Sequence, residues 1–313
     1  MTASVPPSAS RRARGRLWRL AQALVIAAVL FFWGRAVWTN WPTFAAQEWH
    51  FQPAYLTASF VLVLTQLFLL AAIWRWTLTR LGVRRPWRET TRIWALSQIA
   101  RYLPGGIWDV AGRFAMGAQA GYPALALSFS ILLEMVLQAL TAALAFVLSL
   151  PFWPQLPPEA GLRWTIPLSI LGLAALHPRV IQFGLRTAAR LLRMELPAVT
   201  LRYGDMLFLL LCHMLTQLCI GAGFHLFMRA VYPAWPAGLW PVAVGTYSAA
   251  WLIGFLIVFV PMGIGVREGI IVMLLAPFVP FAPANAVAIG FRLWIALRDA
   301  LFAGIGALLR PSD

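Results

Sequence analysis

The sequence contains no lysine and few residues of the kinds that most enzymes use for chemistry. All 25 basic residues are arginine, and there are 10 acidic residues, 4 histidines and 2 cysteines. Charged residues make up 11% of the chain, whereas soluble domains carry about 25%. So few charges could not cover the surface of a soluble protein, so the composition excludes a soluble enzyme or a soluble nucleic-acid-binding protein.

The motifs of common enzymes and cofactor sites are also missing. The sequence has no P-loop, no zinc-ligand spacing, no Gly-x-Ser-x-Gly and no acidic pair suited to a divalent metal. Cys212 and Cys219 are seven residues apart, which on a helix separates them by about 10 Å, too far for a disulfide. We therefore expect no cofactor, no metal and no catalytic residue, and ATP hydrolysis by this chain is not expected.

Hydrophobic residues make up 61% of the chain and are grouped in long runs. The runs predict an all-α, polytopic integral membrane helix bundle with about seven or eight spans. We expect a disordered basic tail at 1–16, one transmembrane domain at 17–309 and a short tail at 310–313. The expected spans and the shorter apolar segment cover 17–38, 54–74, 124–150, 164–177, 205–229, 239–260 and 284–309. The first of these resembles a signal peptide, but it is long enough to be a retained anchor helix.

The distribution of arginine orients these spans. The N-terminus and the loops near 80 and 190 are rich in arginine, whereas the loops near 45, 155 and 234 are poor in it. The positive-inside rule therefore predicts a cytoplasmic N-terminus in a bacterial-type inner membrane. The net charge of +15 also favours contact with anionic lipids, and residues 178–200 fit an interfacial helix. Whether Pro261–Pro280 crosses or re-enters stays open, as does the side of the C-terminus.

Two segments interrupt the apolar pattern with helix-breaking residues and charges. The first is RYLPGGIWDVAGR, Arg101–Arg113, inside an element expected at 93–120, and the second is Pro261–Glu268. Proline followed by two glycines cannot continue a helix, and charged groups are costly in hydrocarbon unless they are paired or hydrated. The sequence therefore predicts two broken or re-entrant helical elements with polar groups at membrane depth. The similarity between the two segments is either an internal repeat or chance.

The first break offers candidate contacts to an anionic headgroup. Arg101 and Arg113 would hold a phosphate, since guanidinium groups suit bidentate phosphate binding. A helix N-terminus near Trp108, whose ring would stack on the headgroup or anchor at the interface, would favour the anion. The residues expected to let the backbone approach the headgroup are Gly105 and Gly106.

Asp109 and Arg113 are four residues apart, so on a helix they lie on one face and can pair. Such a pair would orient Arg113 for a ligand. The alternative is a structural salt bridge that closes the kink.

A polar stripe runs through the apolar span at 124–150. Ser130, Glu134, Gln138 and Thr141 repeat with helical spacing, so they should face the bundle interior. Glu134 and Gln138 would line a cavity, with Glu134 as a counter-ion or proton carrier. The alternative is an interhelical hydrogen bond of structural value only.

The second break supplies Arg267 and Glu268, at the start of a short helix. Arg267 would join the phosphate site, and Glu268 would pair with Arg101 or Arg292. The alternative is that Glu268 is a helix-start acid favoured by the helix dipole, with Arg267 at the headgroup level. Arg292 lies deep in the last helix, with Asp299 as its expected structural neighbour on the same face, while Arg298 points elsewhere.

These motifs together resemble the lysylphosphatidylglycerol synthase transmembrane, flippase-like family. RYLPGGIWDVAGR, the Glu134 span, Gly263–Gly269 (GIGVREG) and the helix with Arg292 occur in the family's order, and the resemblance covers about 17–309. It implies a polytopic fold that moves lipids or lipid-linked groups between leaflets. The best-known members carry an additional aminoacyltransferase domain, and we expect a stand-alone member because the chain ends at Asp313. The family often has Glu-Arg in this span, whereas Met135 follows Glu134.

The leading hypothesis is a multi-pass flippase-like transporter for an anionic phospholipid or lipid-linked headgroup, which arginines hold in a polar intramembrane cavity. One alternative is a membrane transferase acting on a lipid-linked substrate, with Asp109, Glu134 or Glu268 as a base. Another is a non-transporting accessory subunit of a lipid-modifying enzyme. Membrane lipids are the expected partners, with a homo-oligomer or a lipid-modifying enzyme as further candidates, and no nucleic acid.

Overall fold

The computed structural model of the protein describes residues 51–102, 108–156, 202–257 and 265–309, together with a few isolated positions. This part of the chain is helical and contains no strand, which confirms the all-α prediction for it. Its longer helices are α3 (Pro53–Arg80), α4 (Trp87–Ile99), α5 (Trp108–Gln119), α6 (Ala124–Ser149), α9 (Tyr203–Val231), α10 (Trp240–Leu256), α11 (Val266–Leu275) and α12 (Phe281–Leu308). Short 3-10 turns occupy Ala100–Tyr102, Leu150–Phe152 and Ala237–Leu239.

Several predicted features lie outside the described residues. Apart from isolated positions, these include the first span at 17–38, the apolar segment at 164–177 and the interfacial helix at 178–200. At the two breaks, 103–107 and 258–264 also lie outside, and with them Gly105 and Gly106.

Four helical segments of the described chain are long and apolar enough to cross a membrane. They are Pro53–Arg80, Ala124–Phe152, Tyr203–Val231 and Ala237–Leu256, and each matches a predicted span. The first extends beyond the predicted end at residue 74, because Trp74, Thr77 and Leu78 are buried against the bundle after the apolar run has ended. α12 is as long as α3 but carries three charged residues, which lie inside the bundle or beside its cavity as described below.

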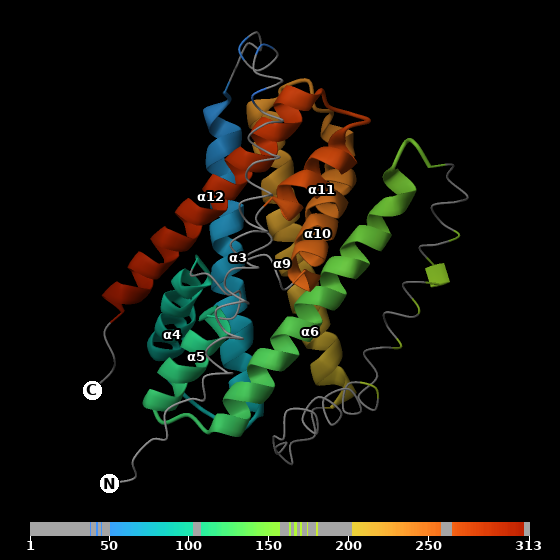
Figure 1. Ribbon diagram of the computed structural model, residues 1–313. Helices are drawn as coiled ribbons and strands as arrows, with labels where there is room; N and C mark the ends of the chain where they lie inside the picture. The colour runs from blue at the N-terminus through green and yellow to red at the C-terminus, as the bar shows by residue number, and fades with distance from the viewer. Residues whose placement is uncertain are drawn as a thin grey trace, which may run out of the picture.

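Small residues bring the spanning helices close together. α3 packs along α9, and α9 packs against α10, which also contacts α6 (Figure 1). Ser59 of α3 donates a hydrogen bond to the Gly223 carbonyl of α9 at 2.7 Å. A methyl group at Gly221 would lie 2.9 Å from the Cα of Val244 in α10. Such close contacts are how membrane helices associate, since apolar burial alone gives little preference for helix over lipid.

Three helices are too short to cross a bilayer. α4 has 13 residues, α5 has 12 and α11 has 10, so each is about 20 Å long or less, against a hydrocarbon core of about 30 Å. α4 and α5 lie beside the half of α3 that ends at Arg80, so this helical pair begins and ends at the same end of the bundle (Figure 1). α5 begins at Trp108, where the sequence predicts a helix N-terminus.

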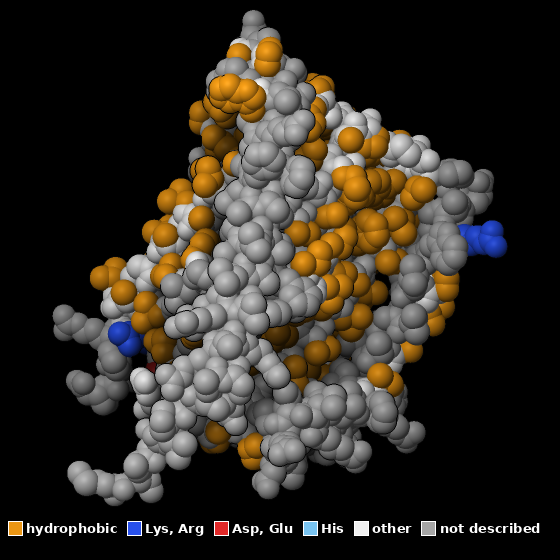
Figure 2. All heavy atoms as spheres, viewed as in Figure 1, with side chains coloured by type: hydrophobic (Ala, Val, Ile, Leu, Met, Phe, Trp, Pro, Cys, Tyr) orange, Lys and Arg blue, Asp and Glu red, His pale blue; other side chains and the backbone are white. Residues whose placement is uncertain are grey.

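The outer surface of the described helices is apolar. Figure 2 shows hydrophobic side chains over most of the described part of one face, with arginine only near its edges. Large side chains such as Leu211, Leu256, Met273 and Leu293 are at least 60% exposed. Because these residues come from several helices, they form the kind of surface that contacts lipid.

The contact at Gly221 gives a test of the packing. Gly221→Ala places a methyl group against the backbone of α10, so we expect a loss of about 1–3 kcal/mol in stability. Gly204→Ala, in the open first turn of the same helix, should be neutral or slightly stabilising because alanine favours helix. Thermal unfolding of the purified protein in detergent measures both. Equal midpoints for the two variants would show that α9 and α10 do not pack as described.

Candidate functional site

A small cavity lies where the two interrupted segments meet. It has a volume of about 40 Å³, enough for more than one water molecule or a group of a few atoms. Its walls come from the turn after α4 and from α10, α11 and α12: Tyr102, Tyr247, Arg267, Glu268, Ile271, Ala288, Phe291, Arg292 and Ile295. Tyr102 and Arg267, which are more than 160 positions apart in the sequence, therefore line one pocket.

Arg267 has no carboxylate partner among the described residues. Its guanidinium carbon lies 5.9 Å from the centre of the Trp251 ring, a cation–π contact, and its buried Nε has no hydrogen-bond partner there. The side chain lies across Gly254 of α10, where a Cβ atom would be 2.5 Å from the Arg267 Cγ. Because glycine has no side chain, position 254 leaves room for Arg267 at the cavity wall.

Glu268 holds the start of α11 and binds Arg292. Gly265 begins the helix with a φ of 78°, a conformation that glycine adopts without strain. Its N–H donates to Glu268 Oε2 at 2.5 Å, and Arg292 Nη1 donates to Glu268 Oε1 at 2.7 Å. Glu268 therefore caps the start of α11 and also pairs with Arg292, one of the two partners that the sequence predicts for it. This pair neutralises Arg292 at the cavity wall.

A second ion-pair network lies beside the cavity, around the fully buried Asp299. Its Oδ1 accepts from Arg298 Nη2 at 2.7 Å, and its Oδ2 accepts from the Tyr102 hydroxyl at 3.0 Å and from Arg101 Nη1 at 3.4 Å. Arg298 also donates to Gln66 Oε1 of α3 at 2.7 Å. Asp299 therefore pairs with Arg298 and Arg101 rather than with Arg292. The prediction that Arg298 points elsewhere is wrong, because its long side chain folds back onto the next residue.

Arg113 belongs to a third, separate cluster and does not line the described cavity. Its Nη1 donates to Glu134 Oε2 at 2.7 Å, and both side chains are about 5% exposed. The guanidinium lies 5.5 Å from the ring centres of both Trp74 and Trp94. The arginine partner of Glu134 therefore comes from α5, although Met135 occupies the position where the family often has arginine.

The polar stripe on α6 does face the bundle interior. Ser130, Glu134 and Thr141 are buried, and Gln138 is partly buried. Gln138 Nε2 donates to Glu134 Oε1 at 3.0 Å, and Ser130 accepts from the Trp74 indole at 3.0 Å. Each of these groups therefore has a protein partner, as a structural network requires.

The predicted pairing of Asp109 with Arg113 is wrong. Asp109 lies 4.0 Å from Arg101 Nη2, and its Oδ1 accepts from the Val110 N–H at 2.9 Å. Asp109 and Arg113 start from one face of α5, as the helical spacing predicts, but Arg113 forms its ion pair with Glu134 of α6. Trp108 is 45% exposed at the start of α5. Of the predicted site residues, the structure thus brings Arg267, Glu268 and Arg292 to the cavity, with Arg101 behind them.

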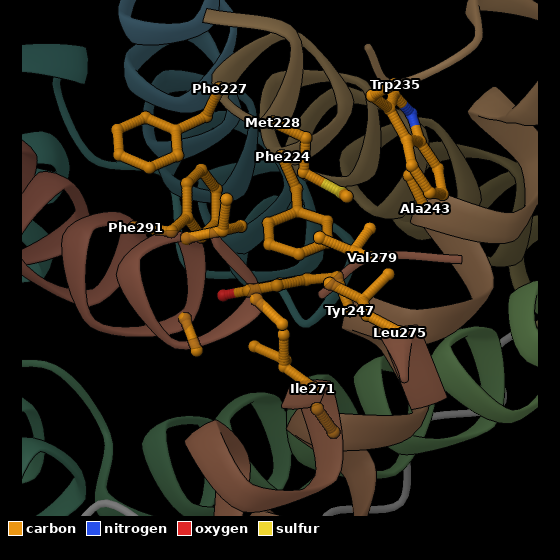
Figure 3. Packing of buried hydrophobic residues seen from close by; sticks show 14 of the residues in the cluster. Phe224, Phe227, Met228, Trp235, Ala243, Tyr247, Ile271, Leu275, Val279 and Phe291 are labelled. Carbon is orange, nitrogen blue, oxygen red and sulfur yellow. The ribbon is translucent and has the colours of Figure 1, made fainter. Parts of the chain in front are cut away.

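Sequence reasoning missed Tyr102, Tyr247, Trp251 and Gly254. Tyr247 extends from α10 past Phe224, and its ring lies 5.3 Å from that of Phe291 in α12, at the edge of the apolar cluster in Figure 3. The buried hydrophobic cluster that contains Phe224, Phe227, Met228 and Phe291 packs against it. No pattern in the sequence distinguishes these residues from ordinary core residues. Within the described chain, no group of three histidine, cysteine or acidic residues could hold a metal ion.

The Arg113–Glu134 pair gives a stability prediction. Arg113→Met leaves a buried carboxylate without its cation, so we expect a loss of about 3–5 kcal/mol. Arg113→Met combined with Glu134→Gln removes both charges and should recover a large part of this loss. Thermal unfolding in detergent compares the single and double variants. A double variant less stable than Arg113→Met alone would contradict a paired, structural role.

The chain matches the family model described as the lysylphosphatidylglycerol synthase TM region over residues 20–297. No curated protein matches it significantly. The matched residues include both interrupted segments, the Glu134 helix and the Arg292 part of α12. The chain therefore belongs to the lysylphosphatidylglycerol synthase TM region family.

Proposed function

We propose that this membrane protein moves an anionic lipid or lipid-linked group between the leaflets, with the headgroup in the cavity beside Arg267. The observation that carries the proposal is an arginine without a carboxylate partner among the described residues, at the wall of a cavity between apolar helices. A guanidinium in that position is costly unless an anion or water satisfies it. The neighbouring Glu268–Arg292 pair and the Tyr102 and Tyr247 side chains line the same cavity.

The short helices support passage of a headgroup. In the proposed arrangement, α4 and α5 enter and leave the membrane on one side. Interrupted helices at membrane depth are common where transporters bind their substrates. The backbone at such breaks is tolerated where it lines a cavity rather than lipid.

The size of the cavity agrees with a closed state of such a transporter. About 40 Å³ holds a few atoms, so acyl chains would stay outside, against the exposed leucines and phenylalanines of the helices. We place the protein in a bacterial-type inner membrane with a cytoplasmic N-terminus, following its arginine distribution. Because the sequence has no nucleotide motif, the proposed transport is downhill, ion-coupled or driven by consumption of the lipid on the far side.

The residues predicted to contact the headgroup have different roles in this arrangement. Arg267 makes the contact, while Arg101 pairs with Asp299 and Asp109 beside the cavity. Glu268 and Arg292 position the wall. Arg113, Glu134 and Gln138 hold the α4–α5 pair against α6 and serve the site indirectly.

A reconstituted system tests the function. Proteoliposomes with a fluorescent anionic phospholipid in the inner leaflet report translocation when a membrane-impermeant quencher is added. Arg267→Gln should lower the rate about tenfold or more, because a charge-assisted contact contributes about 1.5–3 kcal/mol. Arg229→Gln is the matched control, since Arg229 lies at the end of α9, over the Tyr55 ring, away from the cavity.

Both variants should elute and unfold like the unmodified protein. An Arg267→Gln protein that folds normally and moves lipid at the unmodified rate would refute the assignment of the site. Absence of translocation in all proteins, with lipid shown to be covalently altered, would favour the transferase alternative.

A further inference from the structure

The charged groups around the cavity are almost, but not fully, balanced. Among the described residues, this layer contains four arginines and three carboxylates: Arg101, Arg267, Arg292, Arg298, Asp109, Glu268 and Asp299. Glu268 neutralises Arg292 at 2.7 Å. Asp299 and Asp109 together neutralise Arg298 and Arg101, at distances from 2.7 to 4.0 Å. One positive charge is left over, and it is that of Arg267.

The excess charge is held in place by the fold. The Trp251 ring lies beneath the guanidinium, and Gly254 leaves the space that the Arg267 side chain occupies. A cation–π contact offsets only part of the cost of removing a guanidinium from water. The nearby carboxylates cannot offset the rest without leaving another arginine unpaired, because each is already bound.

The excess of one positive charge in this layer specifies the net charge of the ligand that would neutralise it. A group with one negative charge would neutralise the layer. A group with two would leave an uncompensated negative charge in a medium of low dielectric constant, where such a charge is expensive. A zwitterionic headgroup brings its own cation and would leave the layer with its excess charge. Guanidinium also pairs well with two phosphate oxygens.

We propose that the cavity binds one singly charged phosphodiester through Arg267, and that it discriminates against phosphomonoesters and zwitterions. This inference rests on the proposed function and names its substrate class. The shared chemistry is the phosphodiester monoanion, whether it is carried by a lipid or by a soluble molecule.

The test compares ligands that differ by one charge. Native mass spectrometry of the full-length protein in micelles measures dissociation constants for dioleoyl phosphatidylethanol, phosphatidic acid and phosphatidylcholine at pH 8, where a phosphomonoester carries two charges. We expect phosphatidylethanol to bind about tenfold more tightly than the other two. Dimethyl phosphate, a soluble phosphodiester, distinguishes a lipid ligand from a soluble one. If dimethyl phosphate competes with phosphatidylethanol for binding, the headgroup suffices. If it does not compete, the acyl chains are needed. Either result agrees with the charge assignment.

Three variants connect the preference to the charge balance. Arg267→Gln makes the layer neutral and should abolish the preference. Asp109→Asn adds an excess positive charge and keeps the oxygen that accepts from Val110, so it should shift the preference toward phosphatidic acid. Gly254→Ala displaces Arg267 without changing the charge and should weaken phosphatidylethanol binding, whereas Gly269→Ala, in open space, should not.

The outcomes separate this inference from the proposed function. Equal or tighter binding of phosphatidic acid to the unmodified protein overturns the charge assignment, as does an unchanged preference in Arg267→Gln. If translocation still depends on Arg267 in that case, the proposed function stands. If translocation is independent of Arg267 while the charge preference holds, the site binds a phosphodiester but does not transport it.

Discussion

The cost of keeping arginine away from water governs this structure. Each buried guanidinium demands acceptors, and an unpaired one costs several kcal/mol. The described chain meets much of this demand with carboxylates: Glu134 for Arg113, Glu268 for Arg292, and Asp299 for Arg101 and for the adjacent Arg298. The pairs between segments tie the short helices to the long ones. Arg267 has no carboxylate partner among the described residues, and its buried Nε, like those of Arg92 and Arg229, has no hydrogen-bond partner there.

α12 connects the two interrupted segments. Its first half contacts α11 through Arg292, and its second half packs against α4 and contacts the turn after α4 through Asp299. Tyr102 belongs to both regions, since it binds Asp299 and lines the cavity. The cavity thus lies where two networks of charges meet.

Much of the fold follows from the sequence, whereas the charge partners do not. The long apolar runs predict α6 and α9 to within about two residues, because the width of a bilayer fixes their length. Pro104 and the glycines predict the end of α4 and the start of α5. The number of spans and the path of the segments outside the described residues remain predictions.

The Glu268–Arg292 pair agrees with the sequence, but the other charge pairs do not, because pairing depends on tertiary geometry. Asp109 and Arg113 share a helix face, but Glu134 is a better placed acceptor for Arg113. Arg298 and Asp299 diverge at Cα, yet the flexible arginine closes the gap. Helical spacing specifies where side chains start and leaves open where long ones end.

The contact between Gly254 and Arg267 makes the identities of two distant positions depend on each other. A side chain at 254 and a long side chain at 267 cannot occupy the same space. Substitutions at these positions should therefore be tolerated in concert rather than singly. Among relatives, the pair should covary: a larger residue at the first position should accompany a shorter one at the second. In an alignment, this covariation of positions 254 and 267 would distinguish relatives that have an arginine at 267 from relatives that lack it.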